Sequence, residues 1–264
     1  MKPEEFTDVR YEAQDSVAVL TIDRPQRYNA FRGRTVDELI AGFRAAWADS
    51  QVGAIVLTGA GEKAFCTGGD QKQRAETGDY GETESGLFEI ERLHRLIRHV
   101  PKPVIAAVNG FAIGGGHVLH VLCDLTVASR TAKFGQSGPR VGSFDAGFGT
   151  AYLARVVGEK RARQIWFLLD QYDAETAERW GLVNQVVDPD ELLPTALAWG
   201  RRISALSPTA LKFLKHSFNA DSDHMVGLAH LAYDGLELFT GTDEAREGYL
   251  AFNEKRTPDF GQFR

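Results

Sequence analysis

Two glycine-rich turns constrain this chain more than any other feature. The first spans residues 67–70, and the second spans residues 114–116 and leads into a predicted helix over 117–123. Glycine permits close approach to the backbone and leaves its N–H group unobstructed. The start of a helix also favours negative charge. If the N–H groups of Gly69 and Gly115 converge, they form a hole for an oxygen that becomes anionic, and each such donor contributes roughly 10²–10³ in rate.

Either turn taken alone also fits an ordinary tight connection between a strand and a helix, which is the simpler explanation. Other glycine motifs are absent from the chain. No phosphate-binding G-x-x-x-x-G-K-[ST] pattern occurs, and residues 59–61 lack the third glycine of a dinucleotide fingerprint. No G-x-S-x-G elbow for a nucleophilic serine occurs either.

Apolar periodicity predicts alternating strands and helices, which is typical of an α/β core. Strands are expected at 17–22, 54–58, 104–108, 125–128 and 133–134. Helices are expected at 35–48, 86–100, 117–123, 147–157, 159–170, 174–180 and 189–204. From Pro208 onward the pattern is entirely helical, with helices at 208–219, 226–239 and 242–254.

This pattern predicts a core over residues 1–204 and a helical lobe over 205–264. Because the lobe has no strands to pack on, we expect it to pack on another subunit. The polar residues 72–86 show no periodicity and are interpreted as a mobile flap.

Bulk properties indicate a cytoplasmic protein. Residues 1–8 have neither a basic start nor an apolar run, so no secretory signal is predicted, and no apolar run is long enough for a membrane span. Cys66 and Cys123 lie in apolar stretches, as buried thiols do in a reducing compartment. The net charge of −6 without a basic stripe argues against nucleic-acid binding, and no Cys/His spacing predicts a metal site.

The sequence resembles the crotonase (enoyl-CoA hydratase/isomerase) superfamily over nearly its whole length. The matching segments, in family order and spacing, include AFCTGGD at 64–70, PKPVIA at 101–106, IGGG at 113–116 and FGQ at 134–136. The resemblance implies a core built as a ββα spiral, a homotrimer or homohexamer, and acyl-CoA substrates without a tightly bound cofactor. It also implies an oxyanion hole at Gly69 and Gly115, and makes a scaffold or RNA-binding role the weaker alternative.

Two departures from the family argue against simple hydration. Enoyl-CoA hydratases add water with two glutamates, one placed two residues after the glycine triplet and the other two residues after F-G-Q. Val118 and Gly138 occupy those positions here. Neither side chain can transfer a proton, so an enoyl-CoA hydratase is disfavoured.

Three segments, 68–71, 135–139 and 141–145, resemble a narrower group. This group contains 1,4-dihydroxy-2-naphthoyl-CoA synthases, which close a ring by Claisen condensation, and 2-ketocyclohexanecarboxyl-CoA hydrolases, which open one. Thr83 and Thr240 stand where the synthases carry tyrosines. We therefore favour ring opening of a cyclic β-keto-acyl-CoA. Ring closure, and double-bond isomerisation with Asp145 as proton shuttle, remain alternatives.

The resemblance also assigns roles to individual residues. Asp145 is the expected acid–base group and Ser143 is expected to hold the ring oxygen or the water, although either also suits the N-cap of the following helix. The expected CoA and substrate contacts are Arg27, Thr67, Gly68, Asp70 and Gln71, with Phe252 and Lys255 reaching a neighbouring subunit's CoA.

A bicarbonate or chloride site is the last implication. Gln136, Ser137, Gly138 and Trp166 match residues that hold bicarbonate in some of the ring-forming synthases. Trp166 equally suits a core position, and Lys255 a solvated one. His117 and His120 lie three residues apart on one helix and are expected to be packed or surface histidines, since no carboxylate motif joins them to make a metal site or a serine triad.

Overall fold

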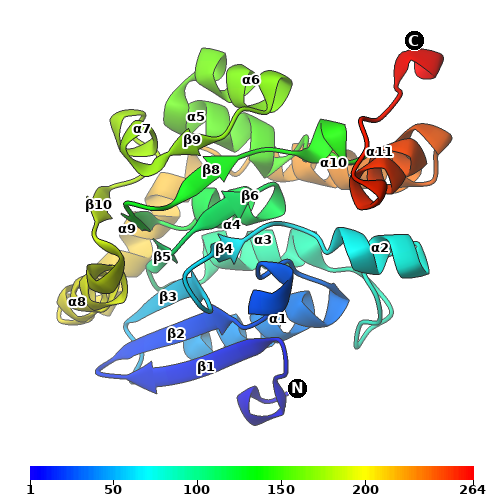
Figure 1. Cartoon of the computed structure of the whole chain (residues 1–264). Coiled ribbons are helices and arrows are strands. Elements are labelled where there is room, and N and C mark those ends of the chain that lie inside the picture. The colour runs from blue at the N-terminus through cyan, green and yellow to red at the C-terminus, as the bar shows by residue number, and fades with distance from the viewer.

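The computed structural model describes all 264 residues, and it confirms an α/β fold with two mixed sheets and C-terminal helices (Figure 1). The larger sheet has the strand order β1-β2-β3-β5-β7-β10, and the smaller has the order β4-β6-β8-β9. The strands are β1 (Val9–Gln14), β2 (Val17–Ile22), β3 (Ala54–Gly59), β4 (Ala64–Cys66), β5 (Val104–Val108), β6 (Phe111–Ile113), β7 (Leu125–Ser129), β8 (Lys133–Gly135), β9 (Tyr172–Asp173) and β10 (Gln185–Val187). Only β1–β2 and β8–β9 pair antiparallel.

The α-helices connect these strands and then form the C-terminal part. They are α1 (Gly33–Ala48), α2 (Gln71–Thr77), α3 (Ile90–His99), α4 (Gly115–Leu122), α5 (Leu153–Val157), α6 (Glu159–Leu168), α7 (Ala174–Arg179), α8 (Leu192–Ser204), α9 (Pro208–Ala220), α10 (Met225–Thr240) and α11 (Asp243–Glu254). A π-helical turn at Phe148–Tyr152 precedes α5. None of the helices combines the length and the apolar character needed to cross a membrane.

The larger sheet is buried on both faces, which explains the continuous apolar strands in the sequence. On β2, Val17 and Val19 face α8, whereas Leu20 and Ile22 face the main core. The expected strands at 17–22 and 104–108 are confirmed to the residue.

The smaller sheet positions the glycine turns. Strands β4, β6 and β8 run parallel, so their carboxyl ends meet at one edge. The turn at 67–70 follows β4, the turn at 114–116 follows β6, and residues 136–138 follow β8. Segments far apart in the sequence therefore lie side by side at this edge.

The flap prediction was wrong for its first part. Residues 71–77 form α2, whose first turn is capped by the Asp70 carboxylate, which accepts from the backbone N–H groups of Lys72 and Gln73. Gly78 ends the helix in the left-handed conformation, with φ 86°. Residues 78–89 carry no helix or strand.

The C-terminal helices pack in part on their own chain. Met225 and Ala229 of α10 belong to the main core, and α11 lies against α2 (Figure 1). The loop at Gly142 also touches α11 so closely that a side chain at Gly142 or Gly248 would overlap the opposite backbone. The helical lobe is therefore part of the wall around the residues that follow β8.

Candidate active site

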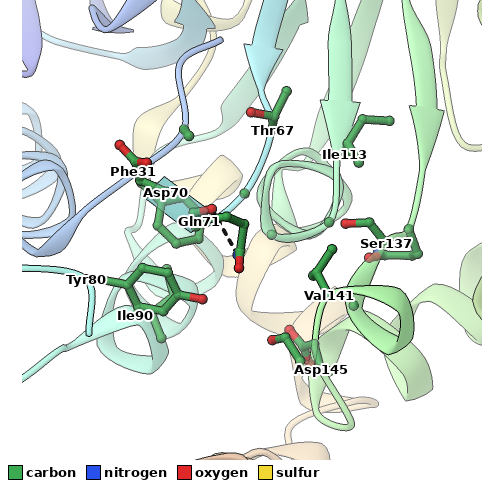
Figure 2. Close-up of a pocket in the computed structure, with 18 of the residues that line it drawn as sticks. Phe31, Thr67, Asp70, Gln71, Tyr80, Ile90, Ile113, Ser137, Val141 and Asp145 are labelled. Atoms are coloured by element: carbon green, nitrogen blue, oxygen red, sulfur yellow. Dashed lines mark hydrogen bonds between the residues drawn. The ribbon is translucent and has the colours of Figure 1, made fainter. Parts of the chain in front are cut away.

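A cavity of about 600 Å³ opens at the carboxyl ends of β4, β6 and β8 (Figure 2). Phe31 and Tyr80 lie on one side of it and Ser137 and Val141 on the other, with Asp145 below them. The C-terminal helices contribute Tyr233, Leu236 and Phe252. The cavity thus draws on the core and on the helical lobe.

Both glycine turns belong to this cavity, and they touch each other. A Cβ on Gly68 would lie 2.9 Å from the nitrogen of Gly115, and a Cβ on Gly116 would overlap the carbonyl of Cys66. Gly68 and Gly114 have φ values of +84° and +58°, where only glycine is comfortable. The sequence uses glycine here because two backbones meet without room for side chains.

The N–H groups of Gly69 and Gly115 are available to a ligand. Gly69 lies between elements, and its N–H makes no backbone hydrogen bond. Gly115 is the first residue of α4, where the N–H has no partner inside the helix. Both residues line the same cavity, and an oxyanion hole formed by their N–H groups stays a prediction.

An aromatic ring packs against the Cα side of each of these two glycines, and no pattern in the sequence predicts this contact. A Cβ on Gly69 would lie 2.6 Å from Cζ of Tyr80, and a Cβ on Gly115 would lie 2.6 Å from Cζ of Phe31. Tyr80 in turn packs on Phe88 with ring centroids 4.8 Å apart. The segment 78–89 therefore supplies one wall of the cavity directly over the Gly69 turn.

Asp145 is half-buried, and its two oxygens have different environments. Oδ1 accepts hydrogen bonds from the backbone N–H groups of Gly147 at 2.9 Å and Gly149 at 3.1 Å, whereas Oδ2 accepts none from the protein. Burial raises the pKa of Asp145, and the amides of Gly149 and Gly147 oppose that rise. The carboxylate caps the following helical turn with one oxygen and leaves the other free. The hydrogen bonds to the following turn are thus confirmed, and the acid–base role of Asp145 stays a prediction.

Asp70 is the only other carboxylate in the cavity wall, and it is already occupied. It is buried, it pairs with Arg24 at 2.9 Å, and it caps α2. Its role is to fix the turn that carries Gly69. Asp145 is thus the one carboxylate in the cavity that is free to move a proton.

Neither position at which the family resemblance leads us to expect a glutamate in hydratases offers a proton-transfer group here, and Gly138 also has no room for a side chain. Val118 is buried in the main core. A Cβ on Gly138 would lie 2.7 Å from the carbonyl oxygen of Ser143 and 3.3 Å from Cα of Phe144. The loop from 138 to 145 folds back on itself at glycine, which brings Ser143 and Asp145 to the cavity.

The residues of the expected anion site lie together in the cavity wall. Gln136, Ser137, Gly138 and Trp166 all line the cavity. However, the indole N–H of Trp166 donates to the carbonyl of Gly149 at 2.7 Å. The amide nitrogen of Gln136 lies 3.3 Å from Nδ1 of His117, which leaves its oxygen buried without a donor. The indole N–H of Trp166 is therefore already used within the chain, and a bicarbonate or chloride site at these residues stays a prediction.

Most of the expected CoA contacts surround the cavity mouth. Arg27, Thr67, Gly68 and Gln71 line it, together with Phe252, whereas Lys255 lies outside it on the surface. Gln71 reaches into the cavity, donating to the carbonyl of Gly69 at 3.2 Å (Figure 2). Two further cations in the wall, Lys72 and Arg140, were missed because isolated surface charges give no sequence signal.

His117 and His120 are packed histidines, as expected. Both are buried, and burial lowers the pKa of His117 to about 3. No three His, Cys, Asp or Glu side chains converge in a way that could hold a metal. A different histidine, His94, lines the cavity beside Tyr233, and the sequence analysis singled out neither.

Comparison with known proteins gives a consistent result. The family model described as enoyl-CoA hydratase/isomerase matches residues 12–263. Among solved structures, an enoyl-CoA hydratase from Mycobacterium avium subsp. paratuberculosis K-10 is 28% identical with a TM-score of 0.86, covering 97% of this chain and 99% of that chain. An enoyl-CoA hydratase/isomerase from Xanthobacter autotrophicus Py2 is 31% identical with a TM-score of 0.81, covering 96% and 99%. A carnitinyl-CoA hydratase from Mycobacterium avium is 30% identical with a TM-score of 0.84, covering 97% and 98%.

Proposed function

The chain belongs to the enoyl-CoA hydratase/isomerase family, the crotonase superfamily of acyl-CoA enzymes, and from this premise we propose that it opens the ring of a cyclic β-keto-acyl-CoA by hydrolysis. The proposal depends on which side chains in the cavity can transfer a proton. Asp145 is the only free carboxylate in the cavity, and both positions that serve hydration are occupied by Val118 and Gly138. Addition of water to a double bond by the two-glutamate route is therefore not available.

The proposed reaction proceeds through a thioester enolate. Asp145 takes a proton from water as the water oxygen bonds to the ring ketone carbon. When the adduct collapses, the bond between that carbon and Cα breaks, and its electron pair passes into the thioester. The N–H groups of Gly69 and Gly115 bind the resulting enolate oxygen, and protonated Asp145 then delivers its proton to Cα. The sum is one water consumed and one carboxylic acid formed, with the CoA thioester retained.

The two halves of the site contribute separate parts of the rate. Each amide donor to an oxyanion contributes roughly 10²–10³. A positioned general base contributes roughly 10²–10⁴. Ser143 lines the same wall as Asp145 and is assigned to hold the attacking water.

CoA binding is assigned to the mouth of the cavity. Arg27, Lys72 and Arg140 place positive charge in a protein whose net charge is −6, which suits the phosphates of CoA. Thr67, Gly68 and Gln71 lie next to the thioester position. Phe252 is 54% exposed at the rim of this chain's own cavity, so it is assigned to the CoA bound there, whereas Lys255 lies outside the cavity and is assigned to a neighbouring subunit's CoA.

The helix α9 gives a reason to expect a neighbouring subunit, because it buries polar side chains and exposes apolar ones. Lys215 and Asn219 are buried, with Lys215 pairing with Asp124 at 2.7 Å, while Phe213 and Phe218 are 66% and 80% exposed. On α10, Leu231 and Leu238 are 70% and 79% exposed. Exposed apolar faces of this kind are typical of protein interfaces. We assign this surface to other copies of the chain in a trimer or hexamer, with residues 205–264 as the oligomerisation lobe.

Isomerisation of an enoyl-CoA is the second candidate, because one carboxylate can take a proton from one carbon and return it to another. Mass measurement after incubation with a six-membered cyclic β-keto-acyl-CoA separates the two. Ring opening adds one water to the substrate, and the rate is independent of added bicarbonate. The proposal fails if the cyclic thioester is recovered unchanged while straight-chain 2-enoyl-CoA is hydrated or its double bond moves.

A further inference from the structure

Two side chains in the cavity wall have no role in the reaction described so far. His94 of α3 and Tyr233 of α10 meet there, with the phenol oxygen 2.6 Å from Nδ1 of the imidazole. His94 is only 2% exposed, and its Nε2 is buried without a partner. Because Nε2 has no partner, no other hydrogen bond fixes the tautomer of this imidazole, and Nδ1 can either donate to the phenol or accept from it.

The pair lies next to the segment that carries Asp145. A Cβ on Gly147 would lie 3.1 Å from Cα of Ala229 and 3.4 Å from Oδ1 of Asp145. Tyr233 follows Ala229 by one helical turn, so the two side chains share a face of α10. The same helix face therefore contacts the Asp145 segment and presents a phenol to the cavity.

Both members of the pair are neutral. Burial lowers the pKa of His94 to about 3. Burial, followed by the negative charges of Asp145 and Glu91, raises the pKa of Tyr233 well above its usual value. The phenol keeps its proton beside a carboxylate, and the neutral imidazole can either accept from it or donate to it. When Nδ1 donates, the phenol O–H is free for a ligand.

We propose that Tyr233 is a second oxyanion-binding group, whose phenol donates a hydrogen bond to the ring ketone oxygen of the substrate while His94 positions that phenol. This inference rests on the proposed ring opening. As water adds to the ketone carbon, the carbonyl electron pair moves onto its oxygen, and the Tyr233 O–H stabilises that charge. On collapse the pair returns, the bond to Cα breaks, and the enolate forms at Gly69 and Gly115. Tyr233 keeps its proton throughout, so the balance of the reaction is unchanged.

The two oxyanion-binding groups act on different oxygens of the substrate. The glycine amides bind the thioester oxygen, and Tyr233 binds an oxygen that only a substrate with a second carbonyl possesses. An acyl-CoA without that ketone still forms an enolate at the glycines with Asp145 as base. Removal of the phenol should therefore slow ring opening and spare exchange at Cα.

The test compares two reactions of Tyr233→Phe. One is ring opening of a six-membered cyclic β-keto-acyl-CoA, and the other is exchange of the Cα hydrogen of cyclohexanecarboxyl-CoA in D₂O. We expect kcat for ring opening to fall about 10²- to 10³-fold with KM within about threefold, and exchange to stay within about twofold. In His94→Leu, kcat for ring opening should also fall. In His94→Asn, which keeps a polar atom at the place of Nδ1, most of this loss in kcat should be recovered.

Tyr172→Phe is the matched control. Its hydroxyl bonds His117 in the core and does not line the cavity, so the variant loses the same type of pair and should keep both activities. Unchanged ring opening by Tyr233→Phe overturns the inference, and so does an equal loss of both reactions. If the wild-type protein exchanges Cα hydrogen but opens no ring, ring opening fails and the role of Tyr233 with it. If it does neither, the enolate function itself is wrong.

Discussion

Replacement of Asp145 by asparagine separates the catalytic role of this residue from its structural one. Asparagine has nearly the same shape and keeps an oxygen that can accept from the N–H groups of Gly147 and Gly149. It removes the negative charge and the base. The structure therefore predicts opposite effects of Asp145→Asn on activity and on stability.

The size of the loss of activity depends on whether the other carboxylate in the cavity can act as the base. Asp70 is tied to Arg24 and to the start of α2, so it cannot replace the missing base. The whole contribution of the base is lost, and we expect kcat to fall about 10²- to 10⁴-fold, or about 3–5 kcal/mol. Added bicarbonate should not restore the rate, because the proposed reaction uses Asp145 and not a bound anion as its base.

The effect on stability follows from the pKa of Asp145, which burial raises above its ordinary value of 3.8. As the pH rises, the unfolded chain loses this proton before the folded chain does, so the charged carboxylate destabilises the fold above the raised pKa. That cost disappears as the pH falls below 3.8. Asp145→Asn should therefore be more stable than the wild type at pH 7, and the difference should shrink toward pH 4.

Urea denaturation at pH 7 and pH 4, with kcat measured on the same preparations, tests both effects. Asp173→Asn is the control. A hydrogen bond to Thr176 lowers the pKa of this half-buried capping residue, which lies outside the cavity, so the loss of its charge should cost stability without activity. A purely capping role for Asp145 predicts a variant that is about as stable as the wild type, because asparagine caps as well as aspartate, and that is still active. That outcome would refute the assignment of Asp145 as the base.

Two further predictions concern the glycine turn and the subunit interface. Gly69→Ala should lower kcat/KM about 10²-fold, because its Cβ would lie 2.6 Å from Cζ of Tyr80. Adding Tyr80→Ala should restore much of the lost kcat/KM in the double variant. If the losses of the two single variants instead add up in steady-state assays, the Tyr80 ring is not the cause. Phe218→Glu places a charge on the exposed face of α9 and should shift the protein toward monomers in sedimentation, whereas the same assembly state as wild type would exclude this surface as the interface.

The sequence predicts the strands well wherever burial on both faces leaves a continuous apolar run, as at β2 and β5. It fails for β1, because Val9–Gln14 is an edge strand whose residues are mostly exposed. It also fails for β4 and β6, which have three residues each, too few for any periodicity. The helix α2 lacks an apolar stripe, yet Asp70 at its start and Gly78 at its end form a recognisable pair of caps.

The glycines of the candidate site are visible in the sequence because two backbones can meet only at glycine. The aromatic wall and the Tyr233–His94 pair are not, since they depend on contacts between α3, α10 and segment 78–89. One signal does exist in α10. Met225, Ala229 and Tyr233 recur every four residues, and a hydroxyl at the third place of a buried stripe indicates a polar group directed inward.

The placement of these residues explains how one fold supports different reactions of acyl-CoA. The glycine turns follow β4 and β6 and are fixed by close backbone contacts of Gly68 with Gly115 and of Gly116 with Cys66. Proton transfer instead depends on residues 138–145, a loop held against Gly248 of α11 and bonded to Arg74 of α2. Because this loop closes over Gly138, where a Cβ would lie 2.7 Å from the carbonyl of Ser143, introducing a glutamate there would displace Asp145 rather than create a hydratase. A change of reaction requires a different path for this loop, and the enolate site can stay as it is.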